Sequence, residues 1–376
     1  MKQLLKAKGI FDGKGNEFLH NKCILIENGV ILSIAGEEEY GSKNDEVEVI
    51  DMSKYYIIPG LIDCHTHLSI VPELGNQIEQ MKIPAPRNIL RSISHIKEDF
   101  RSGVTTMRVM GEENYIDFEI KRAIQDKIIH GPRILAAGKS IVASNGHGVA
   151  LTVADGPEEV RKVARKNLAM GADYLKIFVT GGISTANNSL NNSTYSLEEI
   201  KMATREAEMV DKYVAAHAHG GKGIDICIEA GVRSIEHAAL ITEEQIDKII
   251  KSDAWITITS TILFDDKGVG AKDILNEKIR EKLLYGRELA RENWIKVVNS
   301  GVNFVVGTDS MHGRMSDEII FLTKLGVSNA DAIKVATTKA SDACNLDNVG
   351  ILEKGRVADF IVLKGNPLED INELKN

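Results

Sequence analysis

The sequence predicts an α/β fold, a (β/α)8 TIM-like barrel, and three observations support this prediction. Short apolar runs alternate with longer helical patterns through the middle of the chain, which is typical of repeated βα units. Eight such runs occur within about 290 residues, a length that fits this barrel with some insertions. Polar residues follow five of the eight runs, at the strand ends where barrel enzymes build their active sites.

Each predicted barrel strand is a short apolar run bounded by polar or turn-forming segments. The eight strands are Tyr56–Asp63, Val104–Val109, Arg133–Ala137, Tyr174–Val179, Tyr213–His217, Arg233–His237, Trp255–Thr259 and Asn303–Gly307. Helical patterns fill the intervals, and Ser196 with Glu199 suits a capping box at one helix start. The predicted helices are Ile89–Arg101, Asp117–Ile129, Pro157–Met170, Ser196–Lys212, Ile224–Glu229, Glu243–Lys251, Leu275–Asn299 and Asp317–Leu325.

Both ends of the chain have a different texture, with short β-like runs separated by turns. Asn28-Gly29 predicts a hairpin turn between two of these runs, and Gly365-Asn366-Pro367 closes the last one. The runs are Leu4–Phe11, Lys22–Glu27, Val30–Ala35 and Ala358–Leu363.

Composition and charge restrict the class of protein. The 376 residues are 43% hydrophobic and 27% charged, a globular balance that argues against disorder, collagen or coiled coil as the main architecture. A net charge of −8 argues against nucleic acid as a partner. No apolar run reaches the roughly 18 residues of a membrane span, and the N-terminal residues lack the apolar core of a signal peptide.

The cysteines indicate a reducing compartment. They are scattered and form no CxxC pair, so we expect free thiols rather than a disulfide framework. They are Cys23, Cys64, Cys227 and Cys344. We therefore expect a cytoplasmic enzyme that acts on a small molecule, and we expect it to be a homo-oligomer.

Two histidines end the first predicted barrel strand, in Asp63-Cys64-His65-Thr66-His67. Side chains alternate along a strand, so His65 and His67 point the same way. Two imidazoles on one face can share a metal ion, although two hydrogen-bonded structural histidines would give the same pattern.

Lys176 interrupts the apolar strand Tyr174–Val179. An unpaired ammonium in such a strand costs several kcal/mol or has a lowered pKa. One explanation is that Lys176 extends to solvent at the barrel rim. The other is a neutral amine that captures CO2 as a carbamate, which turns a cation into an anionic ligand able to bridge two metal ions.

Three further histidines and an aspartate end later strands. His217 and His219 share a face, His237 follows Glu236, and Asp309 comes directly after the last predicted strand. Each has a structural explanation when taken alone, and Asp309 would suit a helix N-cap. Because the carboxyl ends of barrel strands converge on one mouth, a single shared site explains the whole set better than separate structural roles do.

Longer motifs accompany these residues along essentially the whole chain. They are Gly60–His67, Gly103–Thr106, Ile235–His237, Gly307–Asp309 and the tail Gly355–Leu363. Together they resemble the amidohydrolase superfamily, in the branch around imidazolonepropionase-like and Xaa-Pro and Xaa-Arg dipeptidase-like enzymes. The resemblance implies a small β-sandwich domain, formed by residues 1–56 and 346–376, beside a metal-dependent hydrolase barrel at 57–345.

The resemblance also implies two divalent metal ions, with zinc as the default for histidine and carboxylate ligands. It implies these ligands: His65, His67 and Asp309 at the more buried ion, His217 and His237 at the more exposed ion, and a carboxylated Lys176 bridging both.

Two more histidines match positions that face the substrate in this family. His219 stands where related dipeptidases often have a tyrosine that polarises the substrate carbonyl, although strand alternation alone does not separate it from His217. His147 lies in a loop after the third predicted strand, and a loop histidine without substrate contact is the alternative. The Asn- and Ser-rich segment Gly181–Thr194 is expected to cover the substrate.

The mechanism that follows is metal-assisted hydrolysis of an amide or peptide bond in a dipeptide or an N-acyl amino acid. Two cations lower the pKa of a bridging water. Asp309 takes the proton as general base and returns it to the leaving amine, while His219 stabilises the oxyanion. Lys139 and Arg314 are candidate partners for a substrate carboxylate, or else solvated surface groups.

Two alternatives remain. The same scaffold could open a cyclic amide or deaminate its substrate, but deaminating relatives often use one metal and lack the bridging lysine, so Lys176 argues against deamination. A non-catalytic scaffold protein is the second alternative, and the full ligand set argues against it. Metal content separates an enzyme from a scaffold.

Overall fold

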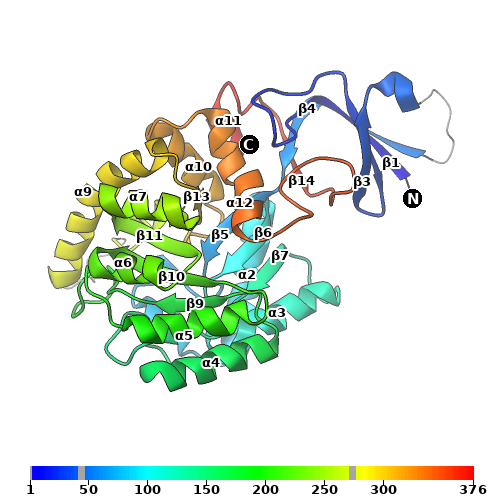
Figure 1. Cartoon of the computed structure of the whole chain (residues 1–376). Coiled ribbons are helices and arrows are strands. Elements are labelled where there is room, and N and C mark those ends of the chain that lie inside the picture. Colours follow the sequence, from blue (N-terminus) through cyan, green and yellow to red (C-terminus); the bar gives the residue numbers. More distant parts are fainter. Residues whose placement is uncertain (1, 41–46, 271–276) are drawn as a thin grey trace.

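The computed structural model describes residues 2–40, 47–270 and 277–376. It shows a barrel surrounded by helices and a smaller sheet beside it, built from both ends of the chain (Figure 1). None of the helices in these ranges has the length and apolar character needed to cross a lipid bilayer.

The predicted barrel is confirmed, and its strands pair in parallel in two arcs, β5-β6-β7 and β8 to β13. The arcs meet where Asp173 N–H donates to Ala136 O (2.8 Å) and where Asp309 N–H donates to His65 O (2.7 Å). The strands are β5 (Leu61–Thr66), β6 (Val104–Val109), β7 (Arg133–Ala136), the short β8 (Ile141–Val142), β9 (Leu175–Phe178), β10 (Val214–Gly220), β11 (Ser234–Leu240), β12 (Trp255–Ile258) and β13 (Phe304–Val306).

Helices cover the outside of the barrel, and a helix is present in each predicted interval (Figure 1). The predicted capping box is confirmed, because Ser196 N–H donates to Glu199 Oε2 (2.7 Å) and Glu199 N–H donates to Ser196 Oγ (3.4 Å). The predicted helix start at Leu275 lies outside the described residues. The covering helices are α2 (Ala85–Arg101), α3 (Ile116–Gln125), α4 (Gly156–Met170), α5 (Leu197–Glu208), α6 (Gly221–Glu229), α7 (Glu243–Ser252), α9 (Glu277–Asn299) and α10 (Met315–Lys324).

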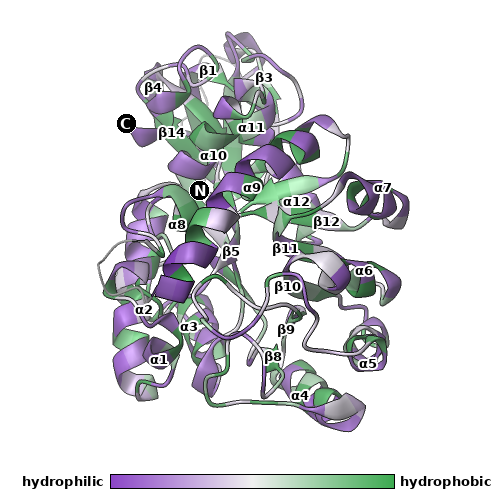
Figure 2. Ribbon diagram, turned by 90° about the vertical axis from the view of Figure 1, so that its left-hand side faces the viewer, coloured by the Kyte–Doolittle hydropathy of each residue, from purple (hydrophilic) through white to green (hydrophobic). Residues whose placement is uncertain are grey.

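Shorter helices lie in the connections. They are α1 (Gln77–Met81), α8 (Thr261–Phe264), α11 (Asn329–Val335), α12 (Thr338–Ala343) and the 3-10 turns Glu37–Tyr40, Pro72–Leu74, Glu113–Tyr115 and Ile371–Lys375. In Figure 2 the barrel strands are mainly hydrophobic, whereas the helices carry both hydrophobic and hydrophilic residues. This pattern places the core between strands and helices. The four cysteines are free and buried, as predicted.

The two chain ends join in one five-stranded sheet, in the order β14-β4-β1-β2-β3. The predicted hairpin is confirmed, with Asn28 and Gly29 at φ 51° and 79° between β2 and β3. The second layer of the expected sandwich stays a prediction. The strands are β1 (Lys2–Ile10), β2 (Cys23–Glu27), β3 (Val30–Ala35), β4 (Val47–Pro59) and β14 (Phe360–Leu363).

The predicted first barrel strand, Tyr56–Asp63, is wrong in extent. The structure divides this apolar run at Gly60, so that β4 belongs to the small sheet and β5 begins the barrel. Gly60 N–H donates to Asp359 O (2.9 Å), and a side-chain carbon at Gly60 would lie 2.4 Å from Thr105 Cγ2. The close approach of the neighbouring strand therefore requires glycine here, and the division follows from packing rather than from the apolar pattern.

Candidate metal centre

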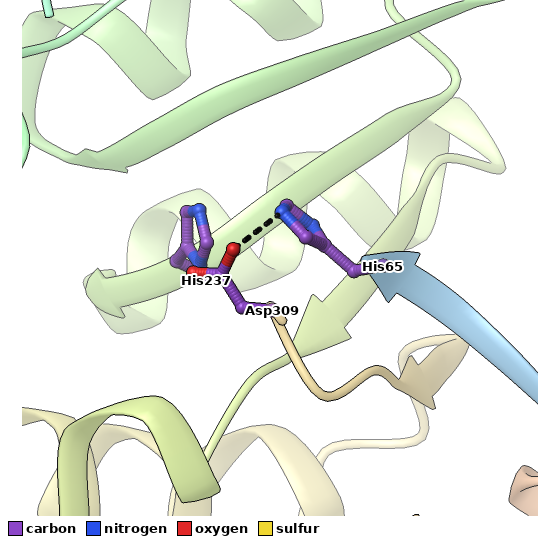
Figure 3. A group of neighbouring side chains, drawn as sticks. All are labelled: His65, His237 and Asp309. Carbon is purple, nitrogen blue, oxygen red and sulfur yellow. Dashed lines mark ion pairs between the residues drawn. The ribbon is translucent and has the colours of Figure 1, made fainter. Parts of the chain in front are cut away.

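The polar residues that were predicted to share a site do converge at the barrel mouth. Figure 3 shows His65, His237 and Asp309 pointing toward one another from β5, β11 and the segment after β13. One ligand atom from each lies within 4.8 Å of the other two, an arrangement that can hold a metal ion. The ring of His217 lies 4.7 Å from that of His237, between ring centres.

His65 and His67 both use their Nδ1 atoms to contact the protein. His65 Nδ1 donates to Glu236 Oε2 (2.7 Å) and His67 Nδ1 donates to Gly111 O (3.0 Å). A ring nitrogen that faces a carbonyl or a carboxylate carries the proton, so Nε2 of each ring is left as a bare donor atom for a metal. His65 Nε2 lies 3.5 Å from Asp309 Oδ1.

The other three histidines lie on two neighbouring strands. His237 Nδ1 contacts Thr259 Oγ1 (2.7 Å), whereas His217 uses Nε2 to contact Gly181 O (3.3 Å). The rings of His217 and His219 are 4.8 Å apart and nearly perpendicular. His219 Nδ1 is buried and has no hydrogen-bond partner among the described residues, so both histidines of β10 face the site.

The electrostatic environment keeps these rings neutral. Burial lowers the pKa of His67 to about 4 and that of His219 to about 3. Burial, reinforced by neighbouring histidines, lowers the pKa of His217 and of His237 well below the usual value. Neutral imidazole is the form that binds metals, so these four rings have the protonation state that a metal requires.

Lys176 is the least satisfied group of the site. Its side chain is 0% exposed, its Nζ has no hydrogen-bond partner among the described residues, and it lies 5.0 Å from the centre of the Phe178 ring. Burial lowers the pKa of Lys176 to about 8. The alternative that Lys176 extends to solvent at the rim is therefore wrong, because the strand carries it into the dry interior.

The left-handed backbone conformation of Asp309 directs its side chain into the site. It follows β13 with φ 48°, in the left-handed region, and Gly307 beside it lies so close to His65 that a side-chain carbon there would be 2.3 Å from His65 N. Burial would raise the pKa of Asp309, but His65, His67 and Lys176 outweigh burial and lower it to about 2. The helix N-cap alternative is wrong, because α10 begins at Met315.

Sequence reasoning missed two charged residues behind the site, Arg108 on β6 and Glu236 on β11. Both side chains are 0% exposed, and Arg108 Nη2 donates to Glu236 Oε1 (3.0 Å). Arg108 and His65 hold the pKa of Glu236 below its usual value despite burial. The signal was available, since a charged residue inside an apolar strand is the same feature that singled out Lys176.

A pocket of about 760 Å³, including space open to solvent, leads to the centre. One wall is apolar, with Ile70, Met81, Ile262 and Leu263. The pocket is also lined by Ile183 and Ser184, so the start of the Asn- and Ser-rich segment borders the pocket, and its covering of the substrate stays a prediction.

His147 also lines this pocket, in the position expected for a substrate contact. Its Nδ1 lies 2.6 Å from Thr185 Oγ1 and its ring 4.7 Å from the ring of His217. Lys282 of α9 donates to Thr185 O (2.6 Å) and to Asn188 O. These contacts fix the covering segment against α9 and hold His147 beside the histidines of the site.

The two candidate partners for a substrate carboxylate, Lys139 and Arg314, differ in whether they contact a residue that lines the pocket. Arg314 is bound to Asp265 (2.9 Å) and to Asp317 (3.0 Å), away from the residues that line the pocket. Lys139 lies 3.5 Å from Glu113, and Glu113 lines the pocket. Lys139 is therefore the better placed of the two.

Comparison with known proteins identifies the family. The amidohydrolase family matches residues 56–376, so this chain belongs to the amidohydrolase family and is a hydrolase that acts on C–N bonds. The family assignment agrees with the histidines, lysine and aspartate that meet at the barrel mouth.

Individual relatives support the same branch of the family. The chain is 30% identical to a Xaa-Pro dipeptidase whose crystal structure holds methionine in the active site, with a TM-score of 0.92 over 100% of this chain and 97% of the other. It is 26% identical to ochratoxinase from Aspergillus niger, over 98% of this chain and 82% of that protein. It is 23% identical to imidazolonepropionase from Picrophilus torridus, over 94% and 88%.

Proposed function

We propose that this chain is a binuclear metal-dependent hydrolase that cleaves an amide or peptide bond in a small substrate, a dipeptide or an N-acyl amino acid. The observation that carries the proposal is Lys176, a buried amine that has no hydrogen-bond partner among the described residues and that lies near His67 and His217. As a free amine it is unfavourable there. As a carbamate it would supply the anionic bridging ligand of a metal pair.

The residues present fit two divalent ions, with zinc as the proposed metal. Two buried nitrogen atoms, Lys176 Nζ and His219 Nδ1, have no hydrogen-bond partner among the described residues, which supports a site that a ligand completes. The residues that would hold the metals are His65, His67 and Asp309 at the more buried ion, His217 and His237 at the more exposed ion, and carboxylated Lys176 between them.

The metals, when bound, would supply Lewis acidity and a water of lowered pKa. Asp309 accepts the proton of the attacking water at its carboxylate and then gives it to the leaving nitrogen. His219 donates to the carbonyl oxygen of the scissile bond, where negative charge develops. His147 lines the pocket beside His217 and orients the substrate there.

The pocket supports a substrate with an apolar side chain and a carboxylate. The wall of Ile70, Met81, Ile262 and Leu263 suits an apolar group. Lys139 is the proposed partner of the free carboxylate, since its ammonium is held only loosely, by Glu113 at 3.5 Å and over the Tyr115 ring at 5.4 Å. The structural similarity to a Xaa-Pro dipeptidase that binds methionine supports a peptide substrate.

Elemental analysis of wild-type protein purified without chelator tests the metal centre. We expect two divalent ions per chain, and we expect Lys176→Ala to lose metal and nearly all activity. Short carboxylic acids should restore part of the activity by standing in for the carbamate. Full activity with one ion, or wild-type metal content and rate in Lys176→Ala, would exclude the binuclear centre with a carbamate.

Matched substrates test the substrate class. Dipeptides and N-acyl amino acids should be hydrolysed faster with a free carboxylate than with an amidated one, and Lys139→Met should remove this preference by raising KM. Activity confined to cyclic amides would favour the cyclic amide hydrolase alternative and leave the hydrolase assignment intact.

A further inference from the structure

We propose that Glu236, held in place by Arg108, is a positioning residue that strengthens metal binding through His65. This inference rests on the proposed metal centre and concerns one of its ligands. It adds two residues that do not themselves touch metal or substrate.

The contact between Glu236 and His65 is short and dry. His65 Nδ1 donates to Glu236 Oε2 at 2.7 Å, and the two side chains are 1% and 0% exposed, respectively. The hydrogen bond fixes the tautomer of His65 and turns Nε2 toward Asp309 and His237. A carboxylate also stabilises the positive charge that the ring gains on binding a cation, which makes Nε2 the stronger donor.

Arg108 holds the carboxylate in place from across the barrel interior. Its Nη2 donates to both oxygens of Glu236 (3.0 and 3.2 Å) and to Thr257 Oγ1 (3.0 Å). Its Nε donates to Cys64 O (2.6 Å), in the residue before His65. The guanidinium therefore links the Glu236 carboxylate to the backbone of the strand that carries His65. This link limits the movement of Glu236 relative to His65.

In the part of the chain that the structure describes, the other three proposed histidine ligands have no carboxylate at the ring nitrogen that contacts the protein. His67 and His217 contact backbone carbonyls, at 3.0 and 3.3 Å, and His237 contacts the hydroxyl of Thr259 at 2.7 Å. Only His65, among these four, is backed by a carboxylate. The difference predicts that loss of the charge on Glu236 weakens the metal site that His65 serves.

Competition between the apoprotein and a chelator of known zinc affinity tests the inference. Glu236→Gln retains an oxygen that accepts from His65 Nδ1 but loses the charge. We expect the zinc affinity at the His65 site to fall by about 10–100-fold. Ser234→Ala is the matched control, because Ser234 Oγ donates to Glu236 Oε1 (2.6 Å) without contacting His65, and its affinity should change by less than about threefold.

Folding and metal binding are separated by a second variant. Glu236→Gln leaves Arg108 buried without its counter-charge, whereas Arg108→Met with Glu236→Gln removes both charges together. The double variant should also bind zinc about 10–100-fold more weakly. A merely structural role would lower the thermal stability of the apoprotein and leave the zinc affinity unchanged, and that result in either folded variant overturns the inference.

The outcomes also separate this inference from the proposed function. If the wild-type protein binds two ions and the variants bind zinc with unchanged affinity, the binuclear centre is supported and the role of Glu236 is rejected. If the wild-type protein binds one ion and the variants bind it more weakly, the role of Glu236 is supported and the binuclear centre is rejected.

Discussion

Two ionisable groups on the floor of the metal centre, Lys176 and His219, and one beside its mouth, Glu318, are all buried, but they differ in their hydrogen bonds. On the floor, Lys176 Nζ and His219 Nδ1 have no hydrogen-bond partner among the described residues. Glu318, on helix α10, is 0% exposed and accepts from two backbone N–H groups and two hydroxyls in the connection after β12, those of Ser260 and Thr261, at 2.5–2.9 Å.

This contrast separates two uses of buried polar groups. An unsatisfied group costs free energy, so it persists where a ligand completes it. A satisfied group stabilises the structure that surrounds it. Glu112 shows the second use again, because it accepts from Ser69 N–H (3.0 Å) and Ser69 Oγ (2.6 Å) and so holds the loop after β5. Substitutions of the unsatisfied groups should therefore affect chemistry, and substitutions of the satisfied groups should affect stability.

The largest expected effect is that of Asp309→Asn. The amide cannot accept the proton of the attacking water, so kcat should fall by roughly 10²–10⁴-fold. Steady-state kinetics across a pH range, with thermal unfolding as the control for folding, measure this. An unchanged kcat and pH–rate profile would place the general base elsewhere.

His219→Ala should have the next largest effect. Loss of a donor to the developing oxyanion costs about 10²–10³-fold, and we expect that decrease in kcat/KM on a dipeptide substrate. His130→Ala, at an exposed histidine, is the control and should match wild type. If both variants retain wild-type kcat/KM, the unsatisfied nitrogen of His219 does not mark a catalytic role.

Much of this floor could be predicted from the sequence, because its residues interrupt apolar runs at strand ends. Lys176 and Asp309 were found that way, and the structure brings them to one mouth. The barrel strands were predictable for a related reason, since each is a short apolar run. The run through Gly60 shows the limit, because only the packing of Thr105 against Gly60 divides it into two strands.

The charged residues behind the floor could be found from the sequence, but the contacts between them could not. Arg108, Glu236 and His65 lie on three different strands, so their contact depends on which side chains meet across the barrel interior. Local pattern contains no such information. The ion pair between Arg314 and Asp265 could not be predicted either, because Asp265 lies in a different connection and contacts Arg314 only in the folded chain.

Lys176→Met tests whether the buried Lys176 amine lowers the free energy of unfolding when no metal is bound. Burial lowers the pKa of Lys176 from 10.5 to about 8. The unfolded chain therefore binds the proton more tightly between these pH values, and apoprotein stability should rise as pH increases from about 8 to about 10.5. Below pH 8 the full penalty applies, and removing it should stabilise the variant by about 3 kcal/mol relative to wild type.

Chemical denaturation of metal-free protein in CO2-free buffer measures this difference. Its pH dependence distinguishes Lys176 from other lysines, because only the difference between wild type and variant is compared. If wild type and Lys176→Met show the same stability at every pH, Lys176 has a compensating partner and does not mark an incomplete site.

Glu318→Gln is the converse test, at the contact between helix α10 and the connection after β12, and has the smallest expected effect. Each carboxylate oxygen of Glu318 accepts from one backbone N–H, that of Ser260 (2.9 Å) or that of Thr261 (2.7 Å). Glutamine offers only one oxygen, so one buried N–H would face an NH2 group and lose its partner. We expect a loss of about 1–3 kcal/mol in the free energy of unfolding, with unchanged metal content in the folded protein. Loss of metal at unchanged stability would show that satisfied groups also tune the centre, and the division between unsatisfied and satisfied groups would fail.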